Sequence, residues 1–205
     1  MTRQITAITP GKKNRSRYNI YIDDEYAFSL SSKAAMTLHA GQPVDENRLE
    51  NLKQNDEREQ AFERCLHYLS FRARSSKEIF TYLGKRGFSP EAARSAVSRL
   101  EDYGYIDDES FAALWVESRR KHRPRGSFAL RRELAEKGVE QKIIDQALAA
   151  YDETEAAYRA ASKKAARWSG LPERERKAKI YNFLKQRGFS LETCREISDR
   201  QSTGE

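Results

Sequence analysis

Apolar and polar positions repeat in three stretches of this chain, spaced 51 and 50 residues apart. The stretches read LGKRGFSPEAARSAV, LAEKGVEQKIIDQAL and LKQRGFSLETCREIS, and they begin at Leu83, Leu134 and Leu184. In each stretch a glycine follows four positions after the leucine, and an apolar residue follows the glycine directly. This pattern is typical of a helix that ends at a left-handed glycine, with the next apolar residue packed on its last turn. It predicts helix ends at Gly87, Gly138 and Gly188, and the similar LEDYGYID predicts one at Gly104.

Each of the three glycines separates two helical patterns, and a further helical pattern lies upstream. The helix before the glycine is marked by Ile79, Tyr82 and Leu83, by Leu130 and Leu134, and by Ile180, Phe183 and Leu184. The helix after it is marked by Ala93, Ala96, Val97 and Leu100 and by Ile144, Ala147, Leu148 and Tyr151. The upstream helix is marked by Phe62, Cys65, Leu66 and Leu69, by Phe111, Leu114 and Trp115, and by Tyr158, Ala161, Ala165 and Trp168. Spacings of three and four residues thus predict three units of three helices.

Capping residues support these helix starts. Ser75 with Glu78 forms a capping-box pattern, Ser89 precedes a proline suited to the first helical position, and Asp107 or Asp108 can cap the helix that carries Trp115. In the third unit, Ser198 stands where the first two units have Val97 and Leu148. We therefore expect the last helix to be short or frayed.

The first 55 residues alternate with a period of two instead. RYNIYID and YAFSL predict a hairpin with Tyr18, Ile20 and Ile22 on one strand and an acidic turn at Asp23-Asp24. QITAIT can add a third strand that ends at Pro10-Gly11, and short helices are expected at 32–39 and 45–55.

The predicted fold class is mainly α: three tandem three-helix repeats, helix-turn-helix-like, in an elongated, curved array behind a small N-terminal β-hairpin/α cap. A unit of fifty residues buries too little surface alone, so the repeats should pack on one another. The predicted domains are residues 1–55, 56–106, 107–152 and 153–205.

Composition favours a soluble protein, because 34% of the 205 residues are charged and mean hydropathy is −0.88. The longest apolar run, FAALWV, is far too short for a membrane span, and the first residues have no apolar core like that of a secretion signal. We expect a cytoplasmic location. Cys65 and Cys194 lie on apolar stripes and are expected to be core residues.

The net charge of +7 is unevenly spread along the chain. Residues 119–137 hold eight Lys or Arg against two Glu, and residues 159–187 hold ten against two. Such segregation favours a polyanionic partner, nucleic acid first. A solvated basic face without a partner is the alternative interpretation.

Catalytic signals are lacking in the sequence. The three histidines have no neighbouring ligand set, and there is no phosphate-binding loop or nucleophile turn. The acidic pairs at Asp23 and Asp107 are explained by a turn and a helix cap. We therefore predict that the protein is not an enzyme and uses no cofactor or metal.

Basic residues concentrate at the turns between helices, where arginine side chains and a helix N-terminus can hold phosphate together. The predicted binding residues are Arg72, Arg74, Arg119, Arg120, Lys121, Arg123, Arg125, Arg131 and Arg132. Secondary basic patches are predicted at Lys12, Lys13, Arg15, Arg17, Lys163, Lys164 and Arg167. An acidic protein surface is an equally possible partner for these arginines. Trp115 and Trp168 are expected in the core, whereas the roles of Phe71 and Phe128 stay open.

The residues of these turns also resemble a known family, the RecX regulatory proteins. The resemblance lies in YLSFRARSSKEIFTYLGKRGF, RLEDYGYIDDESFAALWVESRRKHRPRG and LRRELAEKGVEQKIIDQAL, which cover residues 68–151. The N-terminal RYNIYIDDEYAFSLS and the later KIYNFLKQRGFS are similar to the extension and third unit of the longer members.

This resemblance implies a non-enzymatic modulator that binds the RecA recombinase and its filament on single-stranded DNA. Members of the family usually inhibit ATP hydrolysis, filament growth and strand exchange, within homologous recombination, DNA repair and the SOS response. Weak DNA contact and a monomeric state are expected, with no membrane partner. The alternatives are a stand-alone helix-turn-helix-type DNA-binding protein and, last, a metal-dependent nuclease.

Overall fold

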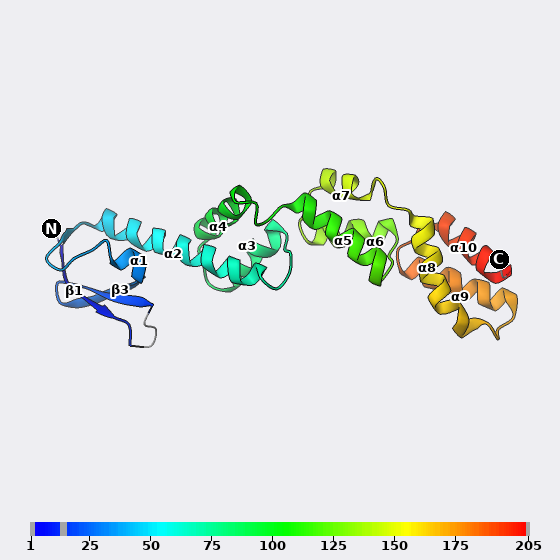
Figure 1. Ribbon diagram of the computed structural model, residues 1–205, viewed down its shortest axis with the longest axis horizontal. Helices are drawn as coiled ribbons and strands as arrows, with labels where there is room; N and C mark the ends of the chain where they lie inside the picture. The colour runs from blue at the N-terminus through cyan, green and yellow to red at the C-terminus, as the bar shows by residue number, and fades with distance from the viewer. Residues whose placement is uncertain (1–2, 13–15, 204–205) are drawn as a thin grey trace. The chain divides into compact units, whose positions relative to one another are not determined.

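A computed structural model of the chain describes residues 3–12 and 16–203. It is mainly helical, with one small sheet near the N-terminus (Figure 1), as the fold class predicted. The chain forms two compact units. The first takes in residues up to 72 together with 79–103, and the second takes in 73–78 together with the residues from 104 onward. Within the described ranges, no helix has both the length and the apolar character needed to cross a membrane.

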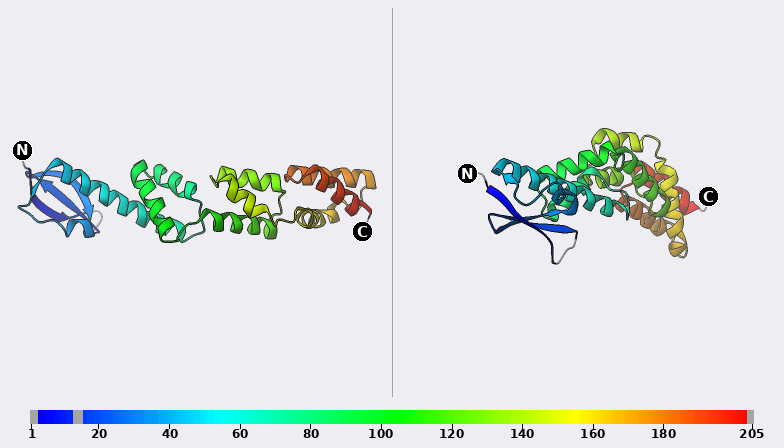
Figure 2. Two further views of the ribbon diagram at one scale, coloured as in Figure 1. Left: turned by 90° about the horizontal axis from the view of Figure 1, so that it is seen from above. Right: turned by 60° about the vertical axis from the view of Figure 1, so that its left-hand side comes forward.

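The sheet of the first unit contains the predicted hairpin. Strands β2 (Arg17–Ile22) and β3 (Glu25–Ser31) pair antiparallel, and both turn residues, Asp23 and Asp24, adopt positive φ. Strand β1 (Arg3–Pro10) pairs with β2, as predicted, and a short β4 (Pro43–Val44) that the sequence did not reveal pairs with β1. The strand order is therefore β3-β2-β1-β4, and Figure 2 shows these strands beside the start of helix α2.

Helix α2 corrects one expectation about this region. The expected helix at 32–39 is only α1 (Ser32–Ala35), and the expected helix at 45–55 continues into the first helix of the first repeat as α2 (Glu46–Leu69). Asp56, in the middle of α2, is buried and accepts from the Ser31 N–H at 2.8 Å and from Arg17 Nη2 at 3.1 Å. The predicted domain boundary after residue 55 thus falls inside one helix that contacts β3. The four domain boundaries themselves stay a prediction.

The remaining helices follow the predicted order. The first repeat continues with α3 (Ser76–Lys85) and α4 (Pro90–Asp102), and the second consists of α5 (Asp108–His122), α6 (Ser127–Glu136) and α7 (Gln141–Leu148). The third consists of α8 (Glu153–Ala165) with the 3-10 turn η1 (Ala166–Trp168), α9 (Glu173–Gln186) and α10 (Leu191–Thr203). The last helix has 13 residues, so the expectation of a short helix was wrong. Ser198 is buried in this helix, and its hydroxyl donates a hydrogen bond to the Arg195 carbonyl, which lowers the cost of burying a polar group.

All four predicted stop glycines have positive φ. At Gly87, Gly138 and Gly188 the next residue donates its N–H to the carbonyl of the leucine five positions earlier, at 3.1 to 3.3 Å. The glycine itself donates three positions back, and together these two bonds form the motif that satisfies the last carbonyls of a helix. After Gly104 the expectation fails, because Tyr105 is 57% exposed and Ile106 is the buried residue.

Caps and cores agree with the predictions in most positions. Ser75 and Glu78 form the reciprocal capping box, and Ser89 and Asp107 cap α4 and α5. Cys65 and Cys194 are buried in the core, as expected. The exceptions are Leu114 and Tyr158, which are exposed, because Ala112, Val116 and Ala157 complete the buried stripes of α5 and α8 instead.

Two similar contacts, here called the first and second joints, occur inside the second unit, which includes residues 73–78 at the start of α3. In the first joint, Ser75 Oγ donates to the Lys137 carbonyl at 2.7 Å, and the Ser76 N–H donates to Asp108 Oδ1 at 2.9 Å. In the second joint, 51 positions later, the Gly126 N–H donates to the Arg187 carbonyl at 3.0 Å. The Ser127 N–H donates there to Glu153 Oε1 at 3.1 Å. In both joints, the start of one repeat's second helix meets the glycine stop and the first helix of the next repeat.

The second joint admits no side chain at its centre, which gives a first prediction. A Cβ atom at Gly126 would lie 2.0 Å from the Gly188 carbonyl oxygen, although the φ of Gly126, −72°, suits any residue. We expect Gly126→Ala to force the two backbones apart and to lower the free energy of unfolding of the second unit by about 1–3 kcal/mol. Urea unfolding followed by tryptophan fluorescence measures this unit, because Trp115 and Trp168, the two tryptophans of the chain, both lie in it.

The matched control for this measurement is Gly170→Ala. A Cβ at Gly170 meets nothing within 4 Å, and its φ is not positive. If Gly126→Ala unfolds at the same urea concentration as Gly170→Ala, the close approach does not limit the stability of the joint.

Candidate functional site

The basic residues predicted to bind a partner lie mainly around the turn from α5 to α6. Two side chains donate hydrogen bonds to carbonyl oxygens of this turn. The Tyr151 hydroxyl donates to the Arg125 carbonyl at 2.6 Å, and Arg187 Nη1 donates to the Pro124 carbonyl at 3.1 Å. Burial raises the pKa of Tyr151 to about 12, so its hydroxyl keeps the proton that it donates at neutral pH. The turn is therefore fixed by groups of the third repeat and of the segment before it.

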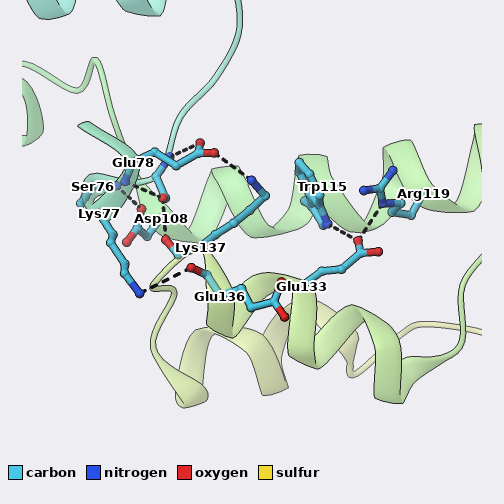
Figure 3. A network of polar contacts seen from close by, with 10 residues as sticks. Ser76, Lys77, Glu78, Asp108, Trp115, Arg119, Glu133, Glu136 and Lys137 are labelled. Carbon is cyan, nitrogen blue, oxygen red and sulfur yellow. Dashed lines mark hydrogen bonds and ion pairs between the residues drawn. The ribbon is translucent and has the colours of Figure 1, made fainter. Parts of the chain in front are cut away.

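Arg119 is bound inside the second repeat. Its Nε donates to Glu133 Oε2 at 2.7 Å, and Trp115 Nε1 donates to the same oxygen at 2.8 Å (Figure 3). The guanidinium also lies 4.5 Å from the centre of the Trp115 ring. Lys137 Nζ lies 4.2 Å from that ring, so the indole is flanked by two cations. These contacts give Arg119 a packing role in α5 and α6.

Arg120 and Lys121 share one acidic partner on their own helix. Arg120 donates to Glu117 through Nε at 2.7 Å and Nη2 at 2.9 Å, and Lys121 Nζ lies 3.1 Å from the same carboxylate. The hydrogen bond from Arg120 is the main cause that lowers the pKa of Glu117 to about 2. Glu117 therefore stays ionised near neutral pH and compensates part of the positive charge here.

Three further arginines of the predicted site also have acidic neighbours. Arg125 Nε lies 3.6 Å from Glu133 Oε1, and Arg131 pairs with Asp145 of α7. Arg132 pairs with Glu136 one turn later at 3.7 Å, and both side chains are 70% exposed. Exposed pairs of this kind contribute little stability, so Arg132 can turn to another anion at small cost.

Arg123 and Arg187 differ from these paired residues. In the part of the chain that the structure describes, neither forms an ion pair with an acidic group. Arg187 is partly buried, and its guanidinium lies 4.6 Å from the centre of the Phe183 ring. Burial first, and then the nearby charges of Arg125 and Arg123, lower its pKa. The structure thus brings three arginines of two repeats together without enough negative charge to balance them.

A pocket of about 160 Å³ opens beside these arginines in the second unit. Its lining consists of Arg125, Phe128, Ala129, Arg132, Glu133, Lys185, Gln186 and Gly188. Phe128 is 72% exposed at its edge. Lys185 and Arg187 were missed by the sequence-based site. Their place beside Arg125 follows from the second joint, a contact between residues more than 60 positions apart that no local sequence signal reveals.

The other predicted binding residues have environments of their own. Arg74 belongs to the second unit, and Arg72 is an exposed residue of the first. Arg17 is held by Asp56 and by Ser29 Oγ at 3.2 Å, which gives it a structural role in the sheet. Lys12, Lys163 and Arg167 are exposed, and Lys164 is partly buried. Lys13 and Arg15 lie outside the described residues.

The tryptophans and cysteines that the sequence singled out have structural roles, as their burial shows. Trp115 and Trp168 pack against the cores of the second and third repeats, as expected, whereas Phe71 is exposed. Burial raises the pKa of Cys65 to about 12, which keeps it a neutral thiol. No cluster of three or more His, Cys, Asp or Glu residues suited to a metal ion occurs among residues 3–12 and 16–203.

Comparison with known protein families identifies four matching regions. Residues 3–45 match the family model described as "Regulatory protein RecX N-terminal domain". Residues 61–100, 107–148 and 151–197 match the models described as the first, second and third three-helix domains of RecX.

Individual proteins extend this similarity over most of the chain. The regulatory protein RecX of Bacillus subtilis is 33% identical over 201 residues, which are 96% of this chain and 76% of that protein. The one from Bacillus licheniformis is 35% identical over 92% of this chain and 73% of its own length. A crystal structure of regulatory protein RecX superposes with a TM-score of 0.72 at 29% identity, covering 96% of this chain and 99% of the other.

Glu133 gives a second prediction, because it is the acceptor for Trp115 and Arg119 and the neighbour of Arg125. We expect Glu133→Ala to lower the free energy of unfolding of the second unit by about 2 kcal/mol, since it leaves a partly buried indole N–H and arginine without their acceptor. Glu136→Ala, on the same helix, removes only an exposed pair and should change it by less than about 0.5 kcal/mol. Urea unfolding of both variants measures the difference, and equal midpoints would contradict the packing role of Glu133.

Proposed function

Because this chain belongs to the RecX family of regulatory proteins, we propose that it regulates the RecA recombinase without catalysing a reaction itself. It binds RecA and the RecA filament on single-stranded DNA, and it inhibits ATP hydrolysis, filament growth and strand exchange. Its setting is homologous recombination and DNA repair in the cytoplasm, where it acts as a monomer.

One observation supports a binding role more than any other. Arg123, Arg125 and Arg187 are gathered at a fixed turn, and the Coulomb repulsion among them is part of what lowers the pKa of Arg187. A cluster of like charges that lowers stability is expected where a partner supplies the opposite charge. A nucleoprotein filament offers that charge, both on the phosphates of its DNA and on acidic side chains of its protein.

The polar residues near this turn also favour binding over catalysis. The Tyr151 hydroxyl keeps its proton, and Glu117 pairs with Arg120 and Lys121. Glu133 accepts hydrogen bonds from Trp115 and Arg119. None of these three groups is placed as a free acid or base beside a nucleophile. The turn presents fixed hydrogen-bond donors instead, which suits recognition of an anionic surface.

Inhibition of RecA gives a third prediction. The wild-type protein, titrated into RecA on single-stranded DNA, should lower ATP hydrolysis at ratios well below one molecule per RecA. Arg123→Glu combined with Arg125→Glu should require about tenfold more protein for the same inhibition, because two attractive charges become repulsive. Circular dichroism checks that the fold is intact.

The matched control for this titration combines Lys142→Glu with Lys179→Glu, which changes the net charge by the same amount. Both lysines are exposed in the second unit, on α7 and α9. If this control loses inhibition as strongly as the arginine variant, the effect reflects net charge and the turn is not the site. Tight, salt-sensitive DNA binding by the wild-type protein without any effect on hydrolysis would favour a stand-alone DNA-binding protein.

A further inference from the structure

In both joints of the second unit, the carbonyl before a stop glycine accepts a hydrogen bond from the start of another helix, but the charges around the two contacts differ. In the first joint, Lys137 precedes the stop glycine, and its Nζ pairs with Glu78 Oε1 at 2.8 Å, with both side chains 18% exposed (Figure 3). The joint thus supplies its own carboxylate. At the equivalent positions of the second joint, 51 and 50 residues later, Ala129 replaces Glu78 and Arg187 replaces Lys137. The second joint therefore keeps the cation but has no carboxylate at the position of Glu78. Its own carboxylate, Glu153, accepts from the Ser127 and Ser190 N–H groups.

Several basic side chains gather at the second joint in addition to Arg187. Arg187 is partly buried beside Arg123 and Arg125, and Lys185 lies in the lining of the adjoining pocket. Among the residues whose structure is described, no acidic group pairs with Arg123, Lys185 or Arg187. The one carboxylate in the lining, Glu133, accepts from Trp115 and Arg119 and lies 3.6 Å from Arg125, so it is shared among three donors. Placing an unpaired, partly buried cation beside like charges destabilises a fold unless an external anion compensates it.

We propose that the second joint is an anion site that binds a phosphate of single-stranded nucleic acid, in the place that the Glu78 carboxylate takes in the first joint. Arg125 and Lys185, which line the pocket, provide the donors, and exposed Arg132 can turn toward the same anion. Arg187, which is outside the lining, adds positive charge beside Arg125. The Gly126–Arg187 backbone contact holds Arg125 and Arg187 at fixed positions, because each lies at or next to a residue of that hydrogen bond.

An exposed aromatic ring beside this pocket favours nucleic acid over an acidic protein surface. Phe128 lies at the pocket edge and corresponds to Lys77 of the first joint, which uses its ammonium to bind the Glu136 carbonyl. An exposed phenyl ring next to a phosphate site is suited to stack on the base of the same nucleotide. The carboxylates of an acidic peptide would not stack on the Phe128 ring. Because a single strand leaves its bases unpaired, it satisfies both groups at once. The inference stands independently of RecA, since it concerns direct binding to the strand.

The test restores the missing carboxylate. Ala129→Glu places an acid where the first joint has Glu78, and Lys185→Glu reverses an exposed cation of the pocket. Each variant should bind a fluorescein-labelled 20-nucleotide oligo-dT about five- to tenfold more weakly in fluorescence anisotropy without RecA. Each should also lower the slope of log affinity against log salt by about 0.7, the value for one phosphate contact with a single strand. Phe128→Ala should weaken binding about fivefold with an unchanged salt slope, because it removes stacking and no charge.

Ala135→Glu is the matched control, because it adds the same charge at an exposed position of the same helix. Circular dichroism verifies the fold. If Ala129→Glu fails to fold, Lys185→Glu decides alone, since the side chain of Lys185 is exposed and its loss leaves the joint hydrogen bonds in place. Binding of Lys185→Glu equal to that of Ala135→Glu overturns the proposal. Displacement of the oligonucleotide by polyglutamate as readily as by unlabelled oligo-dT, with no effect of Phe128→Ala, also overturns it and favours an acidic protein surface.

Discussion

The arrangement of the second unit depends on the close approach of two backbone segments, one at Gly126 and the other at Gly188. A Cβ atom at Gly126 would lie 2.0 Å from the Gly188 carbonyl oxygen, and one at Gly188 would lie 2.5 Å from Ala129 Cβ, so neither glycine has room for a side chain. The stop glycine Gly188 ends α9 through a left-handed residue, and the carbonyl just before it accepts from Gly126 at the start of α6 in the preceding repeat. One residue type thus fixes both the end of a helix and the position of its neighbour. Arg125 and Arg187 lie close together because each is next to, or part of, the backbone segments that meet here.

Much of the fold could be predicted because its determinants are local. A left-handed glycine, a capping box or an acidic hairpin turn depends on residues within five positions of one another, so Gly87, Ser75 and Asp23 could be interpreted from the sequence alone. The error at α2 had a local signal that we overlooked. No glycine or proline occurs between residues 46 and 69, so nothing ends the helix at Asn55. The burial of Asp56 depends on Arg17, a residue on a distant strand, and no periodicity reveals such a pair.

The candidate site was predictable in position but not in detail. Charge density indicated the turn from α5 to α6, but it could not separate Arg119, which packs on Trp115, from Arg123, which has no acidic partner within the described ranges. That difference depends on where Glu133 and Glu117 lie, and so on the packing of α6 against α5. Arg187 was missed because it is 63 residues from Pro124 of the turn in the sequence. Only the joint, which places the third repeat's stop beside Pro124, makes it a neighbour.

The two joints differ in how much sequence change they can tolerate. The first uses a side chain, the Ser75 hydroxyl, and a carboxylate at Glu78, so substitution at either position removes a contact. The contact to the carbonyl before the stop glycine is made in the second joint by main-chain atoms alone, and Glu153 adds one side-chain bond. That main-chain contact is present whatever side chains surround it, provided that the two glycines stay. Residues around the second joint can therefore vary over evolutionary time without loss of the architecture. Such a surface can acquire a new binding specificity while the scaffold that carries it is inherited unchanged.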